Sequence, residues 1–105
     1  MRGFFFRLIP PRADFAQTMT EDERATMTAH FGYWSDLSRE GRVLAFGPVQ
    51  EPAGTYGIGI VLAEDLAEAR AIADGDPASA SPHGFRTEVA PMLSLVTPGE
   101  RFDAL

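Results

Sequence analysis

The segment Phe4–Ile9 is apolar on both of the faces that a β-strand presents. It is aromatic and β-branched, and it ends at Pro10-Pro11, which cannot donate hydrogen bonds to a sheet ladder. Alternate residues of a strand point to opposite sides, which gives two apolar sets: Phe4, Phe6 and Leu8 on one face, Phe5 and Ile9 on the other. Because a solvated sheet face alternates with polar residues, this strand belongs to a sheet that is covered on both faces.

A helix with clear start and stop signals follows this strand. Thr20 and Glu23 form a capping box, and Met19 in front of it is suited to a hydrophobic staple. Apolar or aromatic residues then recur at helical spacing: Met27, His30, Phe31, Trp34 and Leu37. Gly41 is a typical C-terminal stop. The pattern predicts a helix over about 21–40 whose apolar stripe carries a histidine.

The remainder predicts three more strands and one more helix. The strands are expected at 43–48, 56–62 and 85–96, with Pro91 marking an edge or a bulge. The second helix is expected to begin at Glu64 or Asp65 and to end at Gly75. The tail 97–105 is polar and is expected to be peripheral. The order β-α-β-β-α-β is that of a ferredoxin-like α+β sandwich with a four-stranded antiparallel sheet.

The second expected strand is also apolar on both faces. Simple alternation places Val43 and Ala45 on one side and Leu44 and Phe46 on the other. Two helices can cover only one face of a four-stranded sheet, so the second face needs another cover. The simplest is a second subunit, which predicts a symmetric homodimer.

Composition narrows the class of protein. A chain of 105 residues is the size of one domain, here 1–105 with its core at about 4–96. Nine Lys and Arg against fifteen Asp and Glu give a net charge of −6, which argues against nucleic acid as a partner. The sequence has no cysteine, which excludes disulfides and thiolate sites. The short apolar runs predict no membrane span and no signal peptide, so a soluble, cytoplasmic protein is expected.

His30 and Asp76 are the polar residues that stand out. An imidazole on an apolar stripe must be hydrogen-bonded, and it changes charge near neutral pH, which suits proton transfer. A core histidine bonded to a backbone carbonyl is the alternative. Asp76 follows the end of the second helix, where a carboxylate is unfavourable. It either starts a turn with Pro77 or orients an imidazole.

Weaker signals lie elsewhere in the chain. Gly47-Pro48 after the second expected strand is either a turn or the opening of a pocket. Tyr33 and Trp34 can wall an apolar pocket or pack in the core. His83 is expected to be a solvated loop residue. No spacing of histidine and acidic residues predicts a metal site.

These segments, taken in order, resemble the YCII-related (YciI-like) family over about residues 4–96. The matching motifs are His30-Phe31-Gly32-Tyr33-Trp34 with Leu37 and Gly41, Gly47-Pro48, Gly57-Ile58-Gly59-Ile60, Ala69-Arg70 and Asp76-Pro77. The resemblance implies a subunit of the dimeric α+β barrel superfamily. It also implies an active site in which His30 pairs with Asp76 and Gly47-Pro48 lines the same pocket. One branch of the family resembles lyases that eliminate chloride from a hydroxylated aromatic ring.

With this resemblance, the sequence predicts an enzyme that uses His30 and Asp76 for general acid–base chemistry of the lyase or isomerase type. The expected substrate is a small cyclic or aromatic metabolite, with Gly47, Pro48, Tyr33 and Trp34 as binding residues. No metal and no organic cofactor is expected. Two alternatives stay open: a dimeric module that binds a small ligand without catalysis, and an assembly domain whose pocket is filled by side chains.

Overall fold

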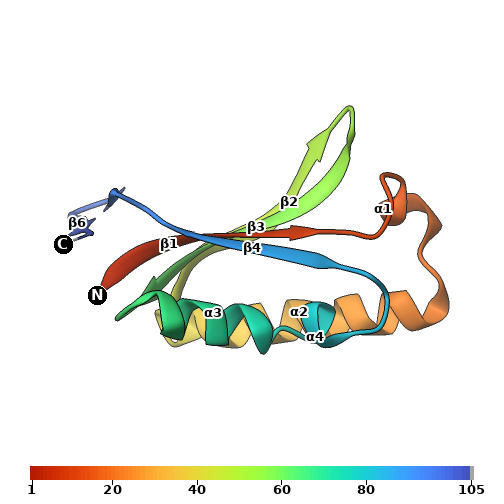
Figure 1. Cartoon of the computed structure of the whole chain (residues 1–105), viewed down its shortest axis with the longest axis horizontal. Coiled ribbons are helices and arrows are strands. Elements are labelled where there is room, and N and C mark those ends of the chain that lie inside the picture. Colours follow the sequence, from red (N-terminus) through yellow and green to blue (C-terminus); the bar gives the residue numbers. More distant parts are fainter. Residues whose placement is uncertain (105) are drawn as a thin grey trace.

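A computed structural model describes residues 1–104, so the last residue of the expected tail, 105, lies outside the described residues (Figure 1). Along the chain the elements are β1 (Arg2–Ile9), α1 (Phe15–Thr18), α2 (Glu21–Arg39), β2 (Val43–Glu51), β3 (Gly54–Ala63), α3 (Leu66–Asp74), α4 (Pro77–Ala80), β4 (Arg86–Pro91), β5 (Ser94–Thr97) and β6 (Glu100–Asp103). The short helices α1 and α4 and the β5–β6 hairpin are additions to the predicted order.

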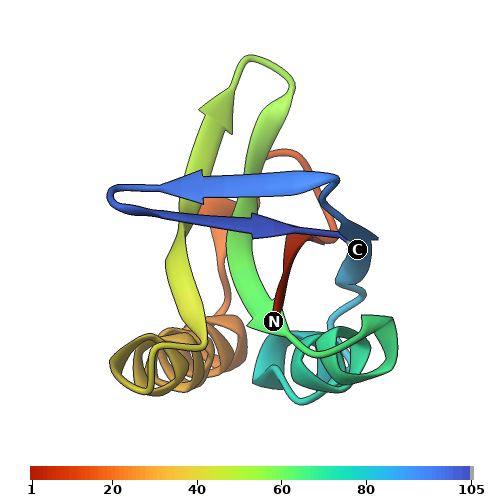
Figure 2. The same cartoon turned by 90° about the vertical axis from the view of Figure 1, so that its left-hand side faces the viewer.

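The main sheet has the strand order β2-β3-β1-β4, and each neighbouring pair is antiparallel. The helices α2 and α3 lie side by side on one face of this sheet, as Figures 1 and 2 show. This is the ferredoxin-like arrangement that the sequence predicts. We call the helix-covered side the helix face of the sheet and the other side the open face.

The longest helix, α2, forms where the capping signals predict it. The Thr20 side chain accepts a hydrogen bond from the Glu23 backbone N–H at 3.1 Å, and Glu23 Oε1 accepts from the Thr20 N–H at 2.8 Å. These bonds satisfy donors that the first turn would otherwise leave free. The helix ends at Arg39, and Gly41 takes the left-handed conformation (φ 77°) that makes glycine favourable at this position.

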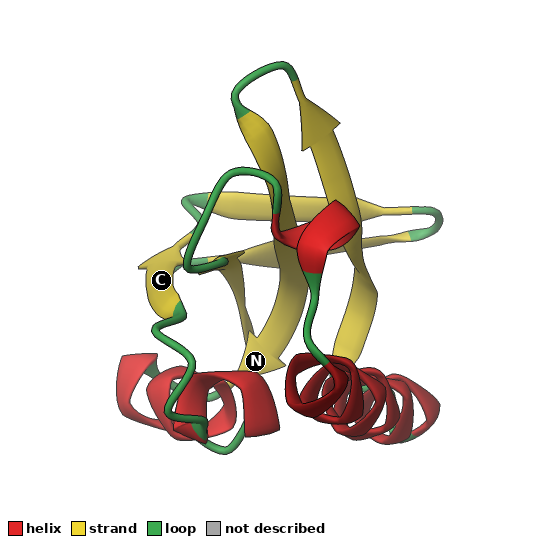
Figure 3. Cartoon of the chain, turned by 90° about the vertical axis from the view of Figure 1, so that its right-hand side faces the viewer, coloured by secondary structure: helices red, strands yellow, loops and turns green. Residues whose placement is uncertain are grey.

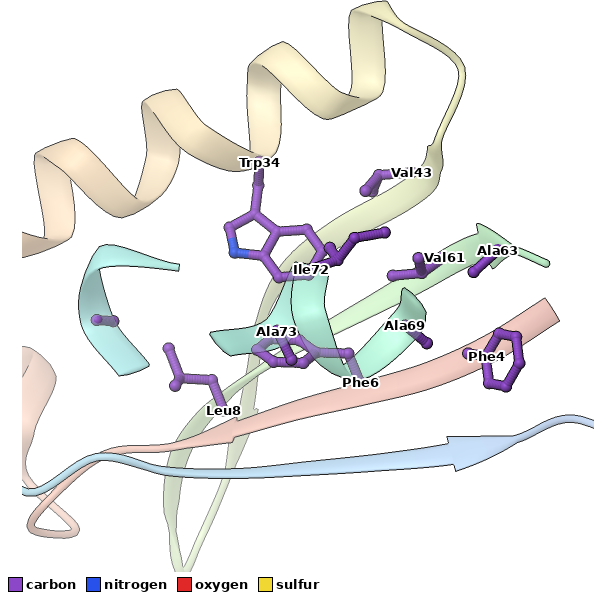
Figure 4. Close-up of a cluster of buried hydrophobic side chains, with 11 residues drawn as sticks. Phe4, Phe6, Leu8, Trp34, Val43, Val61, Ala63, Ala69, Ile72 and Ala73 are labelled. Atoms are coloured by element: carbon purple, nitrogen blue, oxygen red, sulfur yellow. The ribbon is translucent and has the colours of Figure 1, made fainter. Parts of the chain in front are cut away.

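Trp34 is the centre of the core between α2 and the sheet (Figure 4). Its side chain is 1% exposed, and its ring centroid lies 4.6 Å from that of Phe6 on β1. The ring rests against the backbone of β3, since a Cβ built on Gly59 would lie 3.2 Å from Trp34 Cζ3. Gly59 therefore lets the indole approach the sheet closely.

One expectation about strand faces is wrong. Val43 is buried, and Phe46 packs against the same core, so these two residues share the helix face. The register of β2 against β3 shifts between Val43 and Ala45, which indicates a β-bulge or similar irregularity. An extra residue at this point, Leu44, breaks the alternation on which the prediction depended.

The C-terminal part of the chain also differs from expectation. The predicted strand over 85–96 ends at Pro91, and β5 and β6 form a separate hairpin that runs across the direction of the main strands (Figure 2). Leu95 of this hairpin is buried against Gly3, where a Cβ would lie only 2.8 Å from Leu95 Cδ2. Because Gly3 pairs with Leu62 on the open face, the hairpin covers that end of the open face.

Candidate active site

His30 and Asp76 are in direct contact between α2 and α4. His30 Nδ1 lies 2.8 Å from Asp76 Oδ2 and 2.9 Å from Oδ1. The His30 side chain is 16% exposed, whereas Asp76 is 0% exposed. The imidazole therefore lies with one edge against a buried carboxylate and with part of its ring accessible.

Asp76 is held by two further donors. It is the N-cap of α4, where Oδ1 accepts from the Ala78 backbone N–H at 2.8 Å. Its Oδ2 accepts from the indole Nε1–H of Trp34 at 2.8 Å. This carboxylate is an acceptor in both bonds, so its position and orientation are fixed independently of His30.

This arrangement selects one form of the neutral imidazole. A carboxylate can only accept, so Nδ1 of His30 must carry the hydrogen that it shares with Asp76. The lone pair of the neutral ring is then on Nε2, which has no hydrogen bond to any residue that the structure describes. A base of this kind can take a proton on Nε2, and the adjacent carboxylate stabilises the resulting cation.

His30 lines a cavity of about 390 Å³. A volume of this size is at the lower end of small-molecule sites. The lining is largely aromatic and aliphatic, and it comes from β1, α1, α2, the β2–β3 hairpin and the segments around them: Phe6, Leu8, Pro10, Phe15, Ala16, Met19, Met27, His30, Phe31, Trp34, Phe46, Gly47, Pro48, Thr55, Tyr56, Gly57, Ile58 and Phe85. His30 is thus a proton-transfer group at the wall of an apolar cavity.

Of the other residues expected at the site, three line this cavity and one does not. Gly47, Pro48 and Trp34 are in the lining. Tyr33 instead points between α2 and α3, where its hydroxyl donates to the Ile72 carbonyl at 2.7 Å. Burial, and secondly the charge of Asp76, raise the pKa of the Tyr33 phenol. Tyr33 therefore links the two helices rather than facing the cavity.

The sequence analysis missed the outer wall of the cavity. Residues 10–19, including α1, lie above the start of α2 (Figure 3) and supply Pro10, Phe15, Ala16 and Met19. Phe15 is buried and meets the ring of Phe85 edge-on at 5.1 Å. The available signals were the aromatic Phe15 and the apolar Met19, in a connection whose only polar residues are Arg12, Asp14, Gln17 and Thr18. We call residues 10–19 the wall segment.

A charged pair fastens the wall segment to α2. Arg12 donates from both terminal nitrogens to Glu23, at 2.9 and 2.8 Å, and also to the Thr18 carbonyl at 2.8 Å. The hydrogen bond from Arg12, followed by the one from the Thr20 backbone, lowers the pKa of Glu23 to about 2. The same carboxylate therefore caps α2 and holds the cavity wall.

His83 differs from its expected solvated state. It is half-buried, and its Nε2 lies 3.0 Å from the Thr26 hydroxyl on α2. This contact ties the loop before β4 to the helix that carries His30. Within residues 1–104, no group of three or more His, Cys, Asp or Glu side chains is placed to hold a metal ion, and no helix is long and apolar enough to cross a membrane.

A known protein-family model matches most of the chain. The model of the YCII-related domain matches residues 4–93, a range that contains His30, Asp76 and every residue that lines the cavity. A search of the curated proteins finds no match.

Proposed function

Because the chain belongs to the YCII-related domain family, we propose that it is an enzyme for a small cyclic or aromatic metabolite, in which His30 transfers protons and Asp76 orients it. The observation that carries this proposal is the double contact of Asp76 with Nδ1 of a histidine that lines an apolar cavity. The chemistry is general acid–base catalysis of the lyase or isomerase type. General acid–base help of this kind typically accelerates a reaction about 10²–10⁴-fold.

The proposed reaction needs no reactant other than the substrate and the proton that His30 transfers. His30 Nε2 takes a proton from a C–H group next to an activating group, and the electron pair of that bond forms a new double bond. In an elimination, the leaving group departs with its own bonding pair. In an isomerisation, His30 returns the proton to a different atom of the substrate. The apolar wall strengthens the interaction between the imidazolium and Asp76 during this step.

Two variants of His30 test this proposal. His30→Ala and His30→Gln are expected to abolish turnover of a substrate found by screening cyclic and hydroxylated aromatic compounds, while the far-UV circular dichroism spectrum stays unchanged. His83→Gln is the matched control, because His83 contacts Thr26 and is not among the cavity-lining residues. Turnover that survives in both His30 variants would show that the histidine does not transfer the proton.

A binding module without catalysis is the second candidate, and the composition of the cavity wall favours it. His30 is the one lining residue whose side chain ordinarily titrates near neutral pH. A purely structural His30 would be replaced by Gln without loss of ligand binding. An NMR titration of the ring, compared with the pH dependence of turnover, distinguishes the two: in the enzyme a pH-dependent step follows the protonation of His30, whereas in the binding module no step follows it.

We further propose that a second copy of this chain covers the open face of the sheet. The β5–β6 hairpin covers the end near Gly3, and beyond it the open face carries the half-buried Phe5, Ile58 and Ile60. Arg7 lies between the rings of Phe5 and Tyr56, with its carbon Cζ 5.7 and 5.0 Å from their centroids. Its Nε is buried and lies at ion-pair distance, 3.7 Å, from Glu88 Oε1, but it has no hydrogen-bond partner in residues 1–104. A buried donor without a hydrogen bond is rare, and a partner subunit would supply a closer acceptor than Glu88.

A further inference from the structure

Two glycines follow each other on the helix face of β3, and only one of them is explained by the core. Across the sheet, Gly59 pairs with Phe6 and Gly57 pairs with Leu8. Glycine inside a strand weakens it, because it gains no packing and loses more conformational freedom on folding. Each of the two positions therefore needs a reason.

The packing of Trp34 explains why position 59 is a glycine. A Cβ at this position would lie 3.2 Å from Trp34 Cζ3 and 3.6 Å from Phe6 Cδ1, so a side chain would push the indole away. The core itself requires a glycine here.

Gly57 has no such neighbour. A Cβ built on it would meet one atom within 4 Å, the Cβ of Leu8 at 3.6 Å, which is an ordinary contact distance. Its backbone is not in the left-handed region, so the main chain accepts other residues. Yet Gly57 lines the cavity together with its two cross-strand partners, Leu8 and Pro48. The space above Gly57 is therefore part of the cavity. Because Gly57 has no side chain, its backbone forms the cavity surface at this point.

We propose that Gly57 is the size-determining residue of the cavity: its bare backbone forms a flat floor for a planar, uncharged aromatic ring. This inference rests on the proposed function, since it concerns the ligand of the same site. The chemistry of the wall agrees with an uncharged ligand, because the lining contains no Arg, Lys, Asp or Glu to pair with a charge. Tyr56 also borders the cavity, but its ring packs against Arg7, and its hydroxyl donates to Glu51 at 2.6 Å, a hydrogen bond that raises the pKa of the phenol.

The proposal predicts a steric effect that grows with the side chain at position 57. The probe is 1-naphthol, a planar and uncharged molecule with one hydroxyl group, titrated into the full-length protein by calorimetry. One methylene group in an apolar pocket changes affinity by about 10-fold or more. Gly57→Ala is therefore expected to weaken 1-naphthol binding about 10-fold, and Gly57→Val to weaken it further.

Gly32→Ala is the matched control. Gly32 lies on α2 with no atom within 4 Å of a built Cβ, and it is not a cavity-lining residue. It is expected to bind 1-naphthol as the wild type does. Thermal melts of all variants accompany the titrations, and Gly57→Ala is expected to melt no lower than the wild type, because the position accepts a Cβ. A Gly57→Ala protein with lowered melting temperature and weak binding would instead show a structural role and overturn the proposal.

Two other results would also overturn it: equal affinity of the wild type and both Gly57 variants, or no binding of 1-naphthol by the wild type. Neither result bears on proton transfer by His30, which is tested by turnover and by the titration of its ring. Conversely, a catalytically silent His30 would leave the steric comparison at position 57 unaffected.

Discussion

The indole N–H of Trp34 and the imidazole Nδ1 of His30 meet the same oxygen of Asp76, each at 2.8 Å. The other oxygen of this carboxylate accepts from the backbone of Ala78. Asp76 therefore links the central core residue, the start of α4 and the candidate base. Because its bond to Trp34 and its bond to Ala78 come from different elements, its geometry is set by the fold before any ligand arrives.

Replacement of Asp76 by asparagine tests this link. An amide offers one acceptor oxygen to the three groups that donate to Asp76, and its own NH₂ must face at least one of them. A buried group left without a partner costs about 1–3 kcal/mol, and more when charge is involved. We expect Asp76→Asn to lower the free energy of unfolding by at least this amount in urea denaturation at pH 7. Asp74→Asn, an exposed carboxylate at the end of α3, is the control. Equal losses in the two variants would contradict the assignment.

Gly59 and Gly57 are expected to respond differently to alanine. At Gly59 the new methyl group lies 3.2 Å from Trp34, so the indole or the strand must move. Overpacking of this kind typically costs about 1–3 kcal/mol. Gly59→Ala should therefore show a lower urea midpoint than the wild type, whereas Gly57→Ala should not. A Gly59→Ala protein as stable as the wild type would mean that Trp34 does not pack on this strand.

The Arg12–Glu23 pair predicts a loss of stability in acid. The hydrogen bond from Arg12 lowers the pKa of Glu23 from its ordinary 4.5 to about 2, so the folded state favours the ionised carboxylate. The stabilisation is complete above the unfolded pKa, and it is lost as the pH falls from about 4.5 towards 2. Urea unfolding at a series of pH values should show that Glu23→Gln loses less stability over this window than the wild type does. Glu21→Gln, at an exposed position of the same helical turn, should keep the wild-type slope.

The proposed dimer predicts that one charge on the open face separates the subunits. Ile60 lies on this face opposite Phe5, and a lysine there would have to be buried without a partner. Ile60→Lys is expected to sediment as a monomer, while the wild type sediments as a dimer. Leu66→Lys is the control, because Leu66 is an exposed apolar residue on the helix layer. A monomeric wild type at micromolar concentration would refute the proposal.

What could be predicted from the sequence depended on how local each signal was. The start and end of α2 were predictable, because the capping box of Thr20 and Glu23 and the stop at Gly41 act within a few residues. The antiparallel sheet followed from the order of the elements. The bulge next to Val43 was not predictable, since one inserted residue leaves the apolar pattern almost unchanged.

In the candidate site, too, features with local signals were predictable and features that depend on distant contacts were not. Spacing along the chain gave no distance between His30 and Asp76, which are 46 residues apart. The residues alone left their pairing as one of two alternatives, and the family resemblance favoured it. The outer wall depends on contacts that no short pattern encodes, such as that of Phe15 with Phe85. Likewise, the burial of Leu95 depends on a glycine at the opposite end of the chain.

The double use of Glu23 has a consequence for local unfolding. Its carboxylate accepts a hydrogen bond from the Thr20 backbone N–H at the start of α2, and it also accepts hydrogen bonds from Arg12 of the wall segment. Release of one contact weakens the other, so amide protons in both stretches should exchange with deuterium at a common rate. A ligand that enters the cavity past the wall segment would then be admitted at the rate at which the first turn of α2 frays.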